Sequence, residues 1–401
     1  MPSVSLPDLT PAEYQRYGRQ ISLPAFGEDG QRRLRASHVL LIGAGGLGSP
    51  AATYLAAAGV GAMTVVDFDR VERSNLHRQP LFGESAIGRS KVEAARARLV
   101  DLNPHVEVEV VDAKLSSHNA LQLVTSCDVV VDGSDNFPTR YLVNDASVLS
   151  GRPNVYASVL RFDGQLSVLC TPNGPCYRCL FPEPPPPGTV PSCAEAGVLG
   201  VLPGLLGTMQ ALEAIKLLSG VGTPAVGRLL LVDALRLEVR SIAVRRDPAC
   251  PACGTRTLTA LVDYEDFCGL GAAATGVMPD SSASPGGGAG VGGWDGVREL
   301  QPAELAQRLA AGAPLAVIDV REGWEWNIGH LSGARHIPLG MFAEAAGSLD
   351  PAAETVVYCH HGVRSLAAAN FLAERGFRRL WNLSGGLDLY AIEADPTMPR
   401  Y

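Results

Sequence analysis

A glycine-rich turn near the start of the chain constrains the fold more than any other feature. Residues 43–48 read Gly-Ala-Gly-Gly-Leu-Gly and match the pattern G-x-G-x-x-G. They follow an apolar stretch, His38–Ile42, and precede a predicted helix over 49–58. Glycines here permit a tight turn and let phosphate groups approach backbone N–H groups at the start of the helix. The turn therefore predicts a nucleotide-binding strand–turn–helix unit.

Strand and helix patterns alternate on both sides of this turn and again in the tail. In chain order the predicted elements are a polar helix at 11–17, strands at 38–42 and 62–67, a helix at 91–102, strands at 105–111, 128–132, 315–319 and 355–358, and a helix at 365–375. The strands are continuous apolar runs, which are typical of a parallel sheet covered by helices on both faces. The expected fold class is α/β throughout.

A segment rich in Gly, Ala and Ser divides the chain. Residues 269–293 lack an apolar periodicity and predict a flexible linker, with a root-mean-square reach of roughly 25–30 Å. The expected domains are 1–268 and 294–401. The four prolines at 184–187 exclude helix and central strand and predict a surface loop.

Composition limits the classes of partner and compartment. The formal net charge of −8 argues against nucleic acid as a partner. We see no signal peptide and no charge-free apolar segment of about 18 residues, so we expect a cytoplasmic protein that does not span a membrane. In that reducing compartment the nine cysteines act as metal ligands, nucleophiles or core residues rather than disulfides.

Acidic and basic residues follow the turn at informative positions. Asp67 ends the next predicted strand, where a carboxylate accepts hydrogen bonds from a ribose hydroxyl. Turn and acid alone are equally typical of an NAD dehydrogenase, whereas the absence of G-x-x-x-x-G-K-[ST] argues against a P-loop NTPase. Arg78 and Lys91 offer cations to a triphosphate, and Asp135 offers a hard oxygen to Mg²⁺. Taken singly, each of these charges has the alternative of being a solvated surface group.

Taken together, these motifs resemble the MoeB/ThiF/HesA family, bacterial relatives of the ubiquitin-activating enzymes. The resemblance covers about residues 11–256 and rests on Gly43–Gly48, Asp67–Asp69, Ser74–Gln79, Gly88 with Lys91, and Ser134–Asn136. It implies a Rossmann-like domain that uses ATP to adenylate the C-terminal glycine of a ubiquitin-like sulfur carrier protein ending in Gly-Gly.

The same resemblance implies roles for individual residues. Asp67 would hold the ribose, Asp135 would hold Mg²⁺, and Arg19 would reach the ATP site of a partner subunit in a homodimer. Asn75, Arg78 and Lys91 would contact the phosphates. The remaining nucleotide-site residues carried over from the motifs are Gly46, Ser74, Leu76, His77 and Asn136.

Two C-x-x-C pairs predict a structural zinc site. They are Cys176 with Cys179 and Cys250 with Cys253. Four thiolates complete a closed tetrahedral Zn²⁺ site, and here they would join distant segments of one domain. Redox-active pairs are the alternative, but two pairs within one α/β domain favour zinc.

Cys193 lies in Pro-Ser-Cys-Ala-Glu, just after the proline run. A thiol near the adenylate would attack the activated carboxyl to form a thioester, or would form a disulfide link to a persulfidated carrier. The alternative is a loop thiol without an essential task, and both interpretations stay open at this point.

The tail contains a second reactive cysteine. Cys359-His-His-Gly-Val-Arg364 follows a predicted strand and precedes a helix. Backbone N–H groups and the helix N-terminus at such a turn stabilise a thiolate or a persulfide. Tyrosine phosphatases use Cys-x₅-Arg to grip phosphate, but Arg364 closes this loop one residue earlier, which suits sulfur better.

This stretch resembles the rhodanese family, together with Val317–Glu322, the motif at 329–338 and Leu383–Gly386. The resemblance covers about 297–400 and implies that Cys359 carries a persulfide, while Asp319, Arg321 and His330 are architectural. His360 and His361 are adjacent on a tight loop and argue against a metal pair.

The two resemblances converge on one function: adenylation of a carrier, then sulfur transfer from Cys359 to give the carrier thiocarboxylate. A cysteine desulfurase would supply the sulfur, and the product would serve the biosynthesis of molybdopterin, thiamine or a related compound. Three alternatives stay open: a rhodanese domain serving a separate acceptor such as cyanide, a tail that only docks a partner, and an NAD dehydrogenase.

Overall fold

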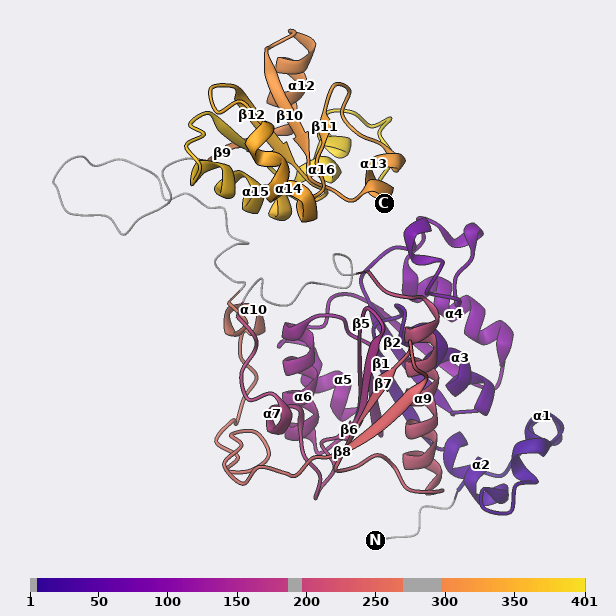
Figure 1. Ribbon diagram of the computed structural model, residues 1–401. Coiled ribbons are helices and arrows are strands. Elements are labelled where there is room, and N and C mark those ends of the chain that lie inside the picture. Colours follow the sequence, from indigo (N-terminus) through magenta and orange to yellow (C-terminus); the bar gives the residue numbers. More distant parts are fainter. Residues whose placement is uncertain (1–5, 187–196, 270–296, 401) are drawn as a thin grey trace. The chain divides into compact units, whose positions relative to one another are not determined.

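The computed structural model describes residues 6–186, 197–269 and 297–400, and Figure 1 shows how they are arranged. The chain forms two compact units, residues 1–279 and 280–401. Apart from Gly269, the predicted linker lies outside the described residues, as do Pro187 and Cys193. Residues 184–186 are neither helix nor strand, as the proline run predicts.

The first unit is built on one eight-stranded sheet with the order β3-β2-β1-β4-β5-β6-β7-β8. Its strands are β1 (His38–Ile42), β2 (Ala62–Asp67), β3 (Glu107–Asp112), β4 (Val129–Asp132), β5 (Asn154–Leu160), β6 (Asp163–Leu169), β7 (Arg228–Asp233) and β8 (Glu238–Ala243). The five strands from β3 to β5 are parallel. From β1 the chain adds β2 and β3 toward one edge of the sheet, and then returns to the other side of β1 to add β4 and β5. This change of direction between β1 and β4 is the arrangement of a Rossmann-like sheet.

The strands predicted in the first unit are parallel as expected, and the sheet continues beyond them into an antiparallel half. Strands β6, β7 and β8 each pair antiparallel with the preceding strand. The register pairs Leu160 with Asp163, so only Arg161 and Phe162 connect β5 to β6. Two residues close an antiparallel hairpin but cannot make the long crossover that parallel strands require.

Helices cover both faces of the parallel half of the sheet (Figure 1). The helices of this unit are α1 (Pro11–Ile21), α2 (Gly27–Arg35), α3 (Gly48–Ala58), α4 (Lys91–Leu102), α5 (Ala120–Thr125), α6 (Phe137–Ser150), α7 (Tyr177–Leu180), α9 (Val201–Ser219) and α10 (Tyr264–Phe267). Helices α3, α4 and α9 lie on one side, and α5 and α6 lie on the other.

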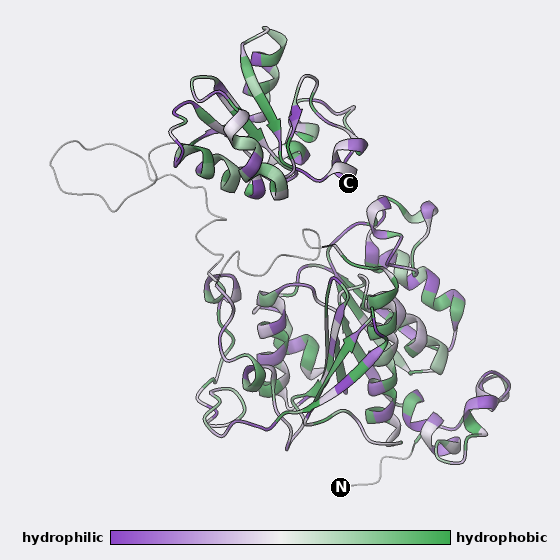
Figure 2. Ribbon diagram, in the orientation of Figure 1, coloured by the Kyte–Doolittle hydropathy of each residue, from purple (hydrophilic) through white to green (hydrophobic). Residues whose placement is uncertain are grey.

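Strand β1 shows why its sequence is apolar without interruption. Val39 and Leu41 enter one hydrophobic core, while Leu40 and Ile42 enter the core on the opposite face. Side chains alternate along a strand, so a strand covered on both faces needs apolar residues at every position. Figure 2 shows the resulting hydrophobic centre of the sheet.

Helix α9 is long and apolar enough to cross a membrane by length and composition, which the sequence analysis did not expect. It carries Glu213 and Lys216, which form an ion pair. It also packs against α3, β5 and β6. These contacts are those of a core helix in an α/β unit.

The second unit is a five-stranded sheet in which all pairs are parallel, with the order β11-β10-β12-β13-β9. Its strands are β9 (Val297–Leu300), β10 (Leu315–Asp319), β11 (Arg335–His336), β12 (Glu354–Tyr358) and β13 (Leu380–Leu383). Its helices are α12 (Pro302–Ala310), α13 (Gly323–Ile328), α14 (Leu339–Ala345), α15 (Val363–Ala373) and α16 (Gly386–Glu393). Along β12, Val357 and Tyr358 enter different cores, so this sheet is also covered on both faces.

Candidate functional site

A cavity of about 340 Å³ opens at the carboxyl edge of the first sheet, beside the ends of β1, β2 and β4. In open α/β sheets a ligand binds where the strand order reverses, and here that point lies between β1 and β4. The glycine turn, residues 43–48, lines one side of the cavity, and Gly133–Asn136 line another.

The glycine turn requires glycine at two positions for a direct physical reason. Gly43 has a φ of +83°, in the left-handed region. A Cβ atom on Gly48 would lie 1.8 Å from the carbonyl oxygen of Gly43. The start of α3 therefore packs against the end of β1 more closely than any side chain allows. This close packing leaves the cavity open above the turn.

Asp67 holds the glycine turn in place. One carboxylate oxygen accepts a hydrogen bond of 2.8 Å from the backbone N–H of Ala44, and the other accepts one of 2.9 Å from the backbone N–H of Asp69. Each carboxylate oxygen can accept a second bond, so Asp67 can hold the turn and a ribose hydroxyl together. Sequence analysis predicted the second task but not the first.

The two predicted cations reach the cavity from different elements. Arg78 donates a hydrogen bond of 2.8 Å to the carbonyl oxygen of Ser74, and its guanidinium lies 2.9 Å from Nε2 of His77. Lys91 begins α4, is nearly buried, and forms an ion pair of 2.7 Å with Asp69. Burial and the charge of Arg78 lower the pKa of His77, which keeps that ring neutral beside the guanidinium.

Two carboxylates at the end of β4 have different environments. Asp135 is exposed and lines the cavity. Asp132 is fully buried behind it and accepts hydrogen bonds from the N–H and hydroxyl of Ser134, at 3.0 and 2.6 Å. Burial raises the pKa of Asp132, while the bonds from Ser134 oppose that shift. Asp132 therefore shapes the loop, and Asp135 is the carboxylate that a cation could use.

The structure brings most, but not all, of the predicted nucleotide-site residues to the cavity. Those that line it are Gly46, Asp67, Asn75, Arg78, Lys91, Asp135 and Asn136. Ser74 and His77 contact Arg78 instead, and Leu76 packs against the core. Arg19 is exposed on α1 and is not among the residues that line this cavity within the described part of the chain.

Several cavity residues were missed by the sequence analysis. They include Asp69, Arg70, Gln79, Thr139, Arg140, Val198 and Pro203. Asp69 and Gln79 lie within motifs already singled out, so their sequence positions close to Asp67 and Arg78 could have identified them as cavity residues. Val198 and Pro203 come from the region that begins α9, and no local pattern connects them to the glycine turn.

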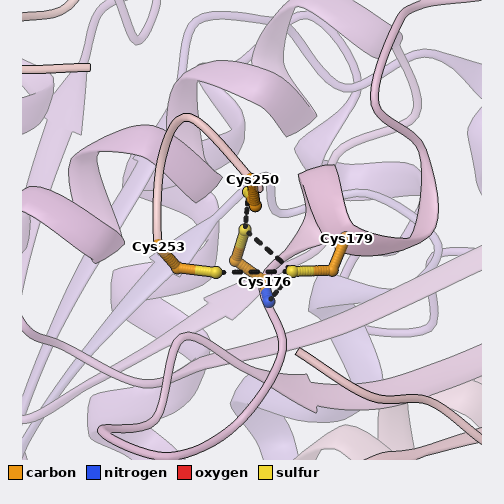
Figure 3. Close-up of side chains that lie close together, drawn as sticks. All are labelled: Cys176, Cys179, Cys250 and Cys253. Atoms are coloured by element: carbon orange, nitrogen blue, oxygen red, sulfur yellow. Dashed lines mark hydrogen bonds between the residues drawn. The ribbon is translucent and has the colours of Figure 1, made fainter. Parts of the chain in front are cut away.

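The four predicted zinc ligands converge in one place (Figure 3). Sulfur–sulfur distances are 3.9 Å for Cys176 to Cys179, 3.6 Å for Cys176 to Cys250 and 3.3 Å for Cys179 to Cys253. Four sulfurs at about 2.3 Å from one Zn²⁺ lie roughly 3.8 Å apart, so this cluster fits tetrahedral zinc. Burial, and then the neighbouring Cys179, raise the pKa of Cys253 to about 11. A bound dication would supply the charge that four adjacent thiolates need.

A buried ion pair ties this cluster to helix α6. Arg178, between the first two cysteines, donates to both oxygens of Asp145 on α6, at 2.8 and 2.7 Å. The hydroxyl of Tyr264 on α10 donates to the same carboxylate at 2.7 Å. The cysteine cluster thus joins α6, α7 and the end of the first unit.

In the second unit, Cys359 follows β12 at the carboxyl edge of the parallel sheet. Cys359–Arg364, here called the cysteine loop, turns through Gly362 at a φ of +92° and enters α15 at Val363. The Gly362 N–H donates to Sγ of Cys359 at 3.1 Å, and the sulfur is buried at the base of the loop. A sulfur anion is stabilised in this environment.

Neighbouring segments fix the loop. Arg364 donates two hydrogen bonds of 2.7 Å to the carboxylate of Glu325 on α13. Backbone N–H groups of Leu387 and Asp388 donate to the carbonyl oxygens of Cys359 and His360, at 2.8 and 3.0 Å. The guanidinium of Arg364 is therefore engaged by Glu325, so it orients the loop.

The other predicted architectural residues also form internal contacts. Arg321 pairs with Asp319 at 2.6 Å, and both side chains are fully buried. Nδ1 of His330 lies 3.1 Å from the carbonyl oxygen of Trp326. Burial, and then the neighbouring His361, lower the pKa of His360 to about 4, so its ring is neutral near pH 7. Among the described residues, the cysteine cluster is the group whose side chains converge as metal ligands do.

The fold, the cavity beside the glycine turn and the cysteine loop together define an α/β enzyme that combines a nucleotide site with a reactive cysteine. Residues 17–252 match the ThiF family, and residues 301–393 match the rhodanese-like domain. The chain belongs to the ThiF family and carries a C-terminal rhodanese domain, as the sequence resemblance indicated.

Similar proteins agree with this assignment. The chain is 44% identical, over the whole of both chains, to "Probable adenylyltransferase/sulfurtransferase MoeZ" of Mycobacterium tuberculosis. Over 65% of this chain and 98% of the relative, it is 55% identical to "Sulfur carrier protein adenylyltransferase" of Thermus thermophilus. Among solved structures, E. coli MccB with MccA-N7isoASN shares the fold, with a TM-score of 0.54, 23% identity, and coverage of 60% of this chain and 75% of that one. By family, the chain is an adenylyltransferase and sulfurtransferase.

Proposed function

We propose that this enzyme uses ATP to adenylate the C-terminal glycine of a ubiquitin-like sulfur carrier protein, and then converts that carboxyl group into a thiocarboxylate with sulfur carried by Cys359. The observation that carries the proposal is the presence, in one chain, of a cation-lined nucleotide cavity and a cysteine loop. The relative from Thermus thermophilus is named for a sulfur carrier protein, which supports the choice of substrate.

The cavity suits attack of a carboxylate on the α-phosphate of ATP. A carrier oxygen forms a bond to the α-phosphorus, and pyrophosphate leaves with the bonding electrons. Negative charge grows on the phosphates during this step, and fixed cations at Arg78 and Lys91 stabilise it. Asp67 would hold the ribose, with Asn75 near the phosphates. Asp135 fits a magnesium ion, which would neutralise part of the phosphate charge.

The position of Arg19 favours a homodimer in this proposal. Arg19 is exposed on α1 and does not line the cavity of its own chain among the described residues. The family resemblance assigns Arg19 to an ATP site, so in this proposal a second copy brings its Arg19 to the cavity. We therefore expect a dimer in which Arg19→Ala and Lys91→Ala each lose activity when tested alone. Mixing the two variants should restore activity, because each mixed dimer then has one site that retains both side chains.

The sulfur step begins at the cysteine loop. The terminal sulfur of a Cys359 persulfide attacks the acyl carbon, a carbon–sulfur bond forms, and AMP leaves. A thiol then attacks Sγ of Cys359, so that a disulfide forms and the carrier thiocarboxylate is released. Cys193 is our candidate for that thiol; it lies outside the described residues, and Val198, five residues later, lines the nucleotide cavity.

The proposal also covers the domain boundaries, the cellular location, the sulfur source and the zinc content of the enzyme. We assign residues 1–268 to the adenylation domain, 269–293 to the linker and 294–401 to the rhodanese domain, in a cytoplasmic enzyme supplied with sulfur by a cysteine desulfurase. The four clustered cysteines would hold one Zn²⁺ per chain. Metal analysis of purified protein should give that ratio, and Cys250→Ser should abolish it while lowering the thermal stability of the first unit.

Carrier-dependent ATP–pyrophosphate exchange tests the first half-reaction. We expect exchange only when a small protein ending in Gly-Gly is present, and no exchange with the same protein lacking its final glycine. If none of the source organism's small proteins ending in Gly-Gly supports exchange, the proposal is contradicted. Exchange without sulfur transfer would instead mean that Cys359 serves a separate acceptor.

A further inference from the structure

Ser365, the residue after the cysteine loop, is completely buried beside Cys359. Its hydroxyl lies 3.4 Å from Sγ of Cys359, 2.7 Å from Oδ1 of Asn382 and 3.0 Å from the carbonyl oxygen of Gly362. All three neighbours can accept a hydrogen bond, but a serine hydroxyl has a single proton to donate. The three acceptors must therefore compete for it.

Asn382 is held so that it always competes. Its amide Nδ2 donates a hydrogen bond of 2.9 Å to the carboxylate of Glu299 on β9. A carboxylate accepts and cannot donate, so this contact fixes which end of the Asn382 amide is the nitrogen. The oxygen end must then face Ser365. Ser384 donates to the other oxygen of Glu299 at 2.7 Å and keeps the carboxylate in place.

The charge on Cys359 decides which acceptor receives the proton. A neutral thiol is a weak acceptor, so the shorter bond to Asn382 is favoured. A sulfur anion forms a charge-assisted hydrogen bond, which is about twice as strong as a neutral one. The hydroxyl then gains more by turning toward sulfur, although it must leave Asn382 to do so.

We infer that Ser365 is a positioning residue for sulfur transfer, whose hydroxyl stabilises the Cys359 anion, and that Asn382, oriented by Glu299, opposes it by competing for the same proton. The inference rests on the proposed role of Cys359 as the sulfur carrier. It adds to that role, because two buried residues outside the cysteine loop, Ser365 and Asn382, would set the proportion of thiol to thiolate at Cys359.

The anion is the form that the loading step needs. Sγ of Cys359, as a thiolate, attacks the outer sulfur of a donor persulfide. A new sulfur–sulfur bond forms, the donor bond breaks, and the donor thiolate leaves with the electron pair. Ser365 and the Gly362 N–H then both face the attacking sulfur.

Other charged groups around the loop are paired or unchanged by the variants proposed below. Arg364 pairs with Glu325, Asp319 with Arg321, and Asp388 with Arg400. His360 and His361 lie on the loop itself. These groups set a constant background, against which a change at residue 365 or 382 can be read.

The test is the pH dependence of Cys359 alkylation by iodoacetamide in the full-length protein, followed by mass spectrometry of the Cys359 peptide. Ser365→Ala should move the midpoint of the profile about one pH unit upward, because a hydrogen bond to a charged group is worth roughly a factor of ten. Ser365→Thr retains the hydroxyl and should largely restore the original midpoint.

Asn382→Leu should move the midpoint in the opposite direction, because the sulfur then competes for the Ser365 proton only with the carbonyl oxygen of Gly362. If that variant does not fold, Glu299→Gln replaces it, with a smaller downward shift expected. Ser348→Ala is the matched control: it removes a serine hydroxyl of the same unit that donates to the carbonyl oxygen of Ala345 and accepts from Arg335, away from Cys359 and Asn382, and it should leave the midpoint unchanged.

An unchanged midpoint in Ser365→Ala, or an upward shift in Asn382→Leu, would overturn the inference. Alkylation does not depend on sulfur transfer, so these outcomes are separate from a failure of the proposed function. That failure would appear as wild-type Cys359 that never acquires a persulfide from a protein persulfide donor.

Discussion

The glycine turn after β1 and the cysteine loop after β12 occupy the same position in two different sheets. Each follows a central parallel strand, passes through a glycine in the left-handed region and leads into a helix. Backbone N–H groups at such a turn stabilise negative charge. The two units therefore use one backbone device at the carboxyl edges of their sheets.

What differs is where the anion comes from. The glycine turn borders an open cavity lined by Arg78 and Lys91, as a large and highly charged ligand requires. The cysteine loop closes around a sulfur that belongs to the chain itself, and the guanidinium of Arg364 is paired with the buried carboxylate of Glu325. An external polyanion needs cationic side chains near the turn, whereas a single internal sulfur needs only N–H and O–H donors.

The largest expected effect separates the two sites completely. Cys359→Ala removes the atom that would hold sulfur in the second unit, so thiocarboxylate formation should fall to the background level. ATP–pyrophosphate exchange should stay within about twofold of wild type, because Cys359 takes no part in forming or reversing the adenylate. A simultaneous loss of exchange would contradict the separation.

Removal of the cavity cations should give the converse result. Arg78→Ala and Lys91→Ala should each lower the exchange rate by about 10²–10³-fold, the usual effect of losing one fixed donor to a developing charge. Persulfide loading of Cys359 should be unaffected. Arg98→Ala is the control, because Arg98 also lies on α4 but pairs with Asp101 outside the cavity.

Alanine at the two turn glycines compares the loops directly. Gly48→Ala should abolish exchange, because the backbone must move to relieve a contact of 1.8 Å. Gly362→Ala should cost about 1–3 kcal/mol, because its φ is unfavourable for a side chain, and should slow only sulfur loading. Gly18→Ala, with nothing within 4 Å, is the control and should be neutral or slightly stabilising. Thermal unfolding and the two assays would distinguish these variants.

The smallest expected effect concerns the start of α6. Asn136 accepts a hydrogen bond of 3.0 Å from the N–H of Thr139 and caps this helix. Asn136→Ala should lower the free energy of unfolding of the first unit by about 1 kcal/mol, whereas Asn136→Ser should retain most of it. Equal losses in both variants would mean that Asn136 acts by something other than capping.

Much of the fold could be predicted because its signals are local. The bounds predicted for β1, β2, α4 and β10 agree with the structure. These segments are apolar on both faces or begin at a clear boundary, so their pattern does not depend on distant contacts. Helix α1 continues to Ile21, past the predicted end at Tyr17, because a glycine such as Gly18 weakens a helix by only about 1 kcal/mol and keeps its backbone N–H.

The antiparallel half of the sheet could not be predicted in the same way. The turn between β5 and β6 places Arg161 at a φ of +55°, where Asn or Gly is the usual signal. Strand β8 is exposed at every residue, so it shows no alternation of buried and exposed side chains. Both features depend on neighbours that the local sequence does not identify.

The same distinction between local sequence signals and tertiary contacts applies to the candidate sites. Asp67, Lys91 and Asp135 were predictable from their positions at the ends of strands and helices. The pairing of Arg364 with Glu325 joins residues 39 positions apart, and Ser365 meets Asn382 across 17. Such contacts come from tertiary packing. They decide how the cysteine is held, although the cysteine itself was evident.

The most direct test of the central claim is the mass of the carrier after reaction with ATP, magnesium, a persulfide donor and a thiol. The account predicts that wild-type enzyme replaces one carrier oxygen with sulfur, and that Cys359→Ala produces the acyl-adenylate without that replacement. Undiminished thiocarboxylate formation by Cys359→Ala would contradict the claim that the second unit delivers the sulfur.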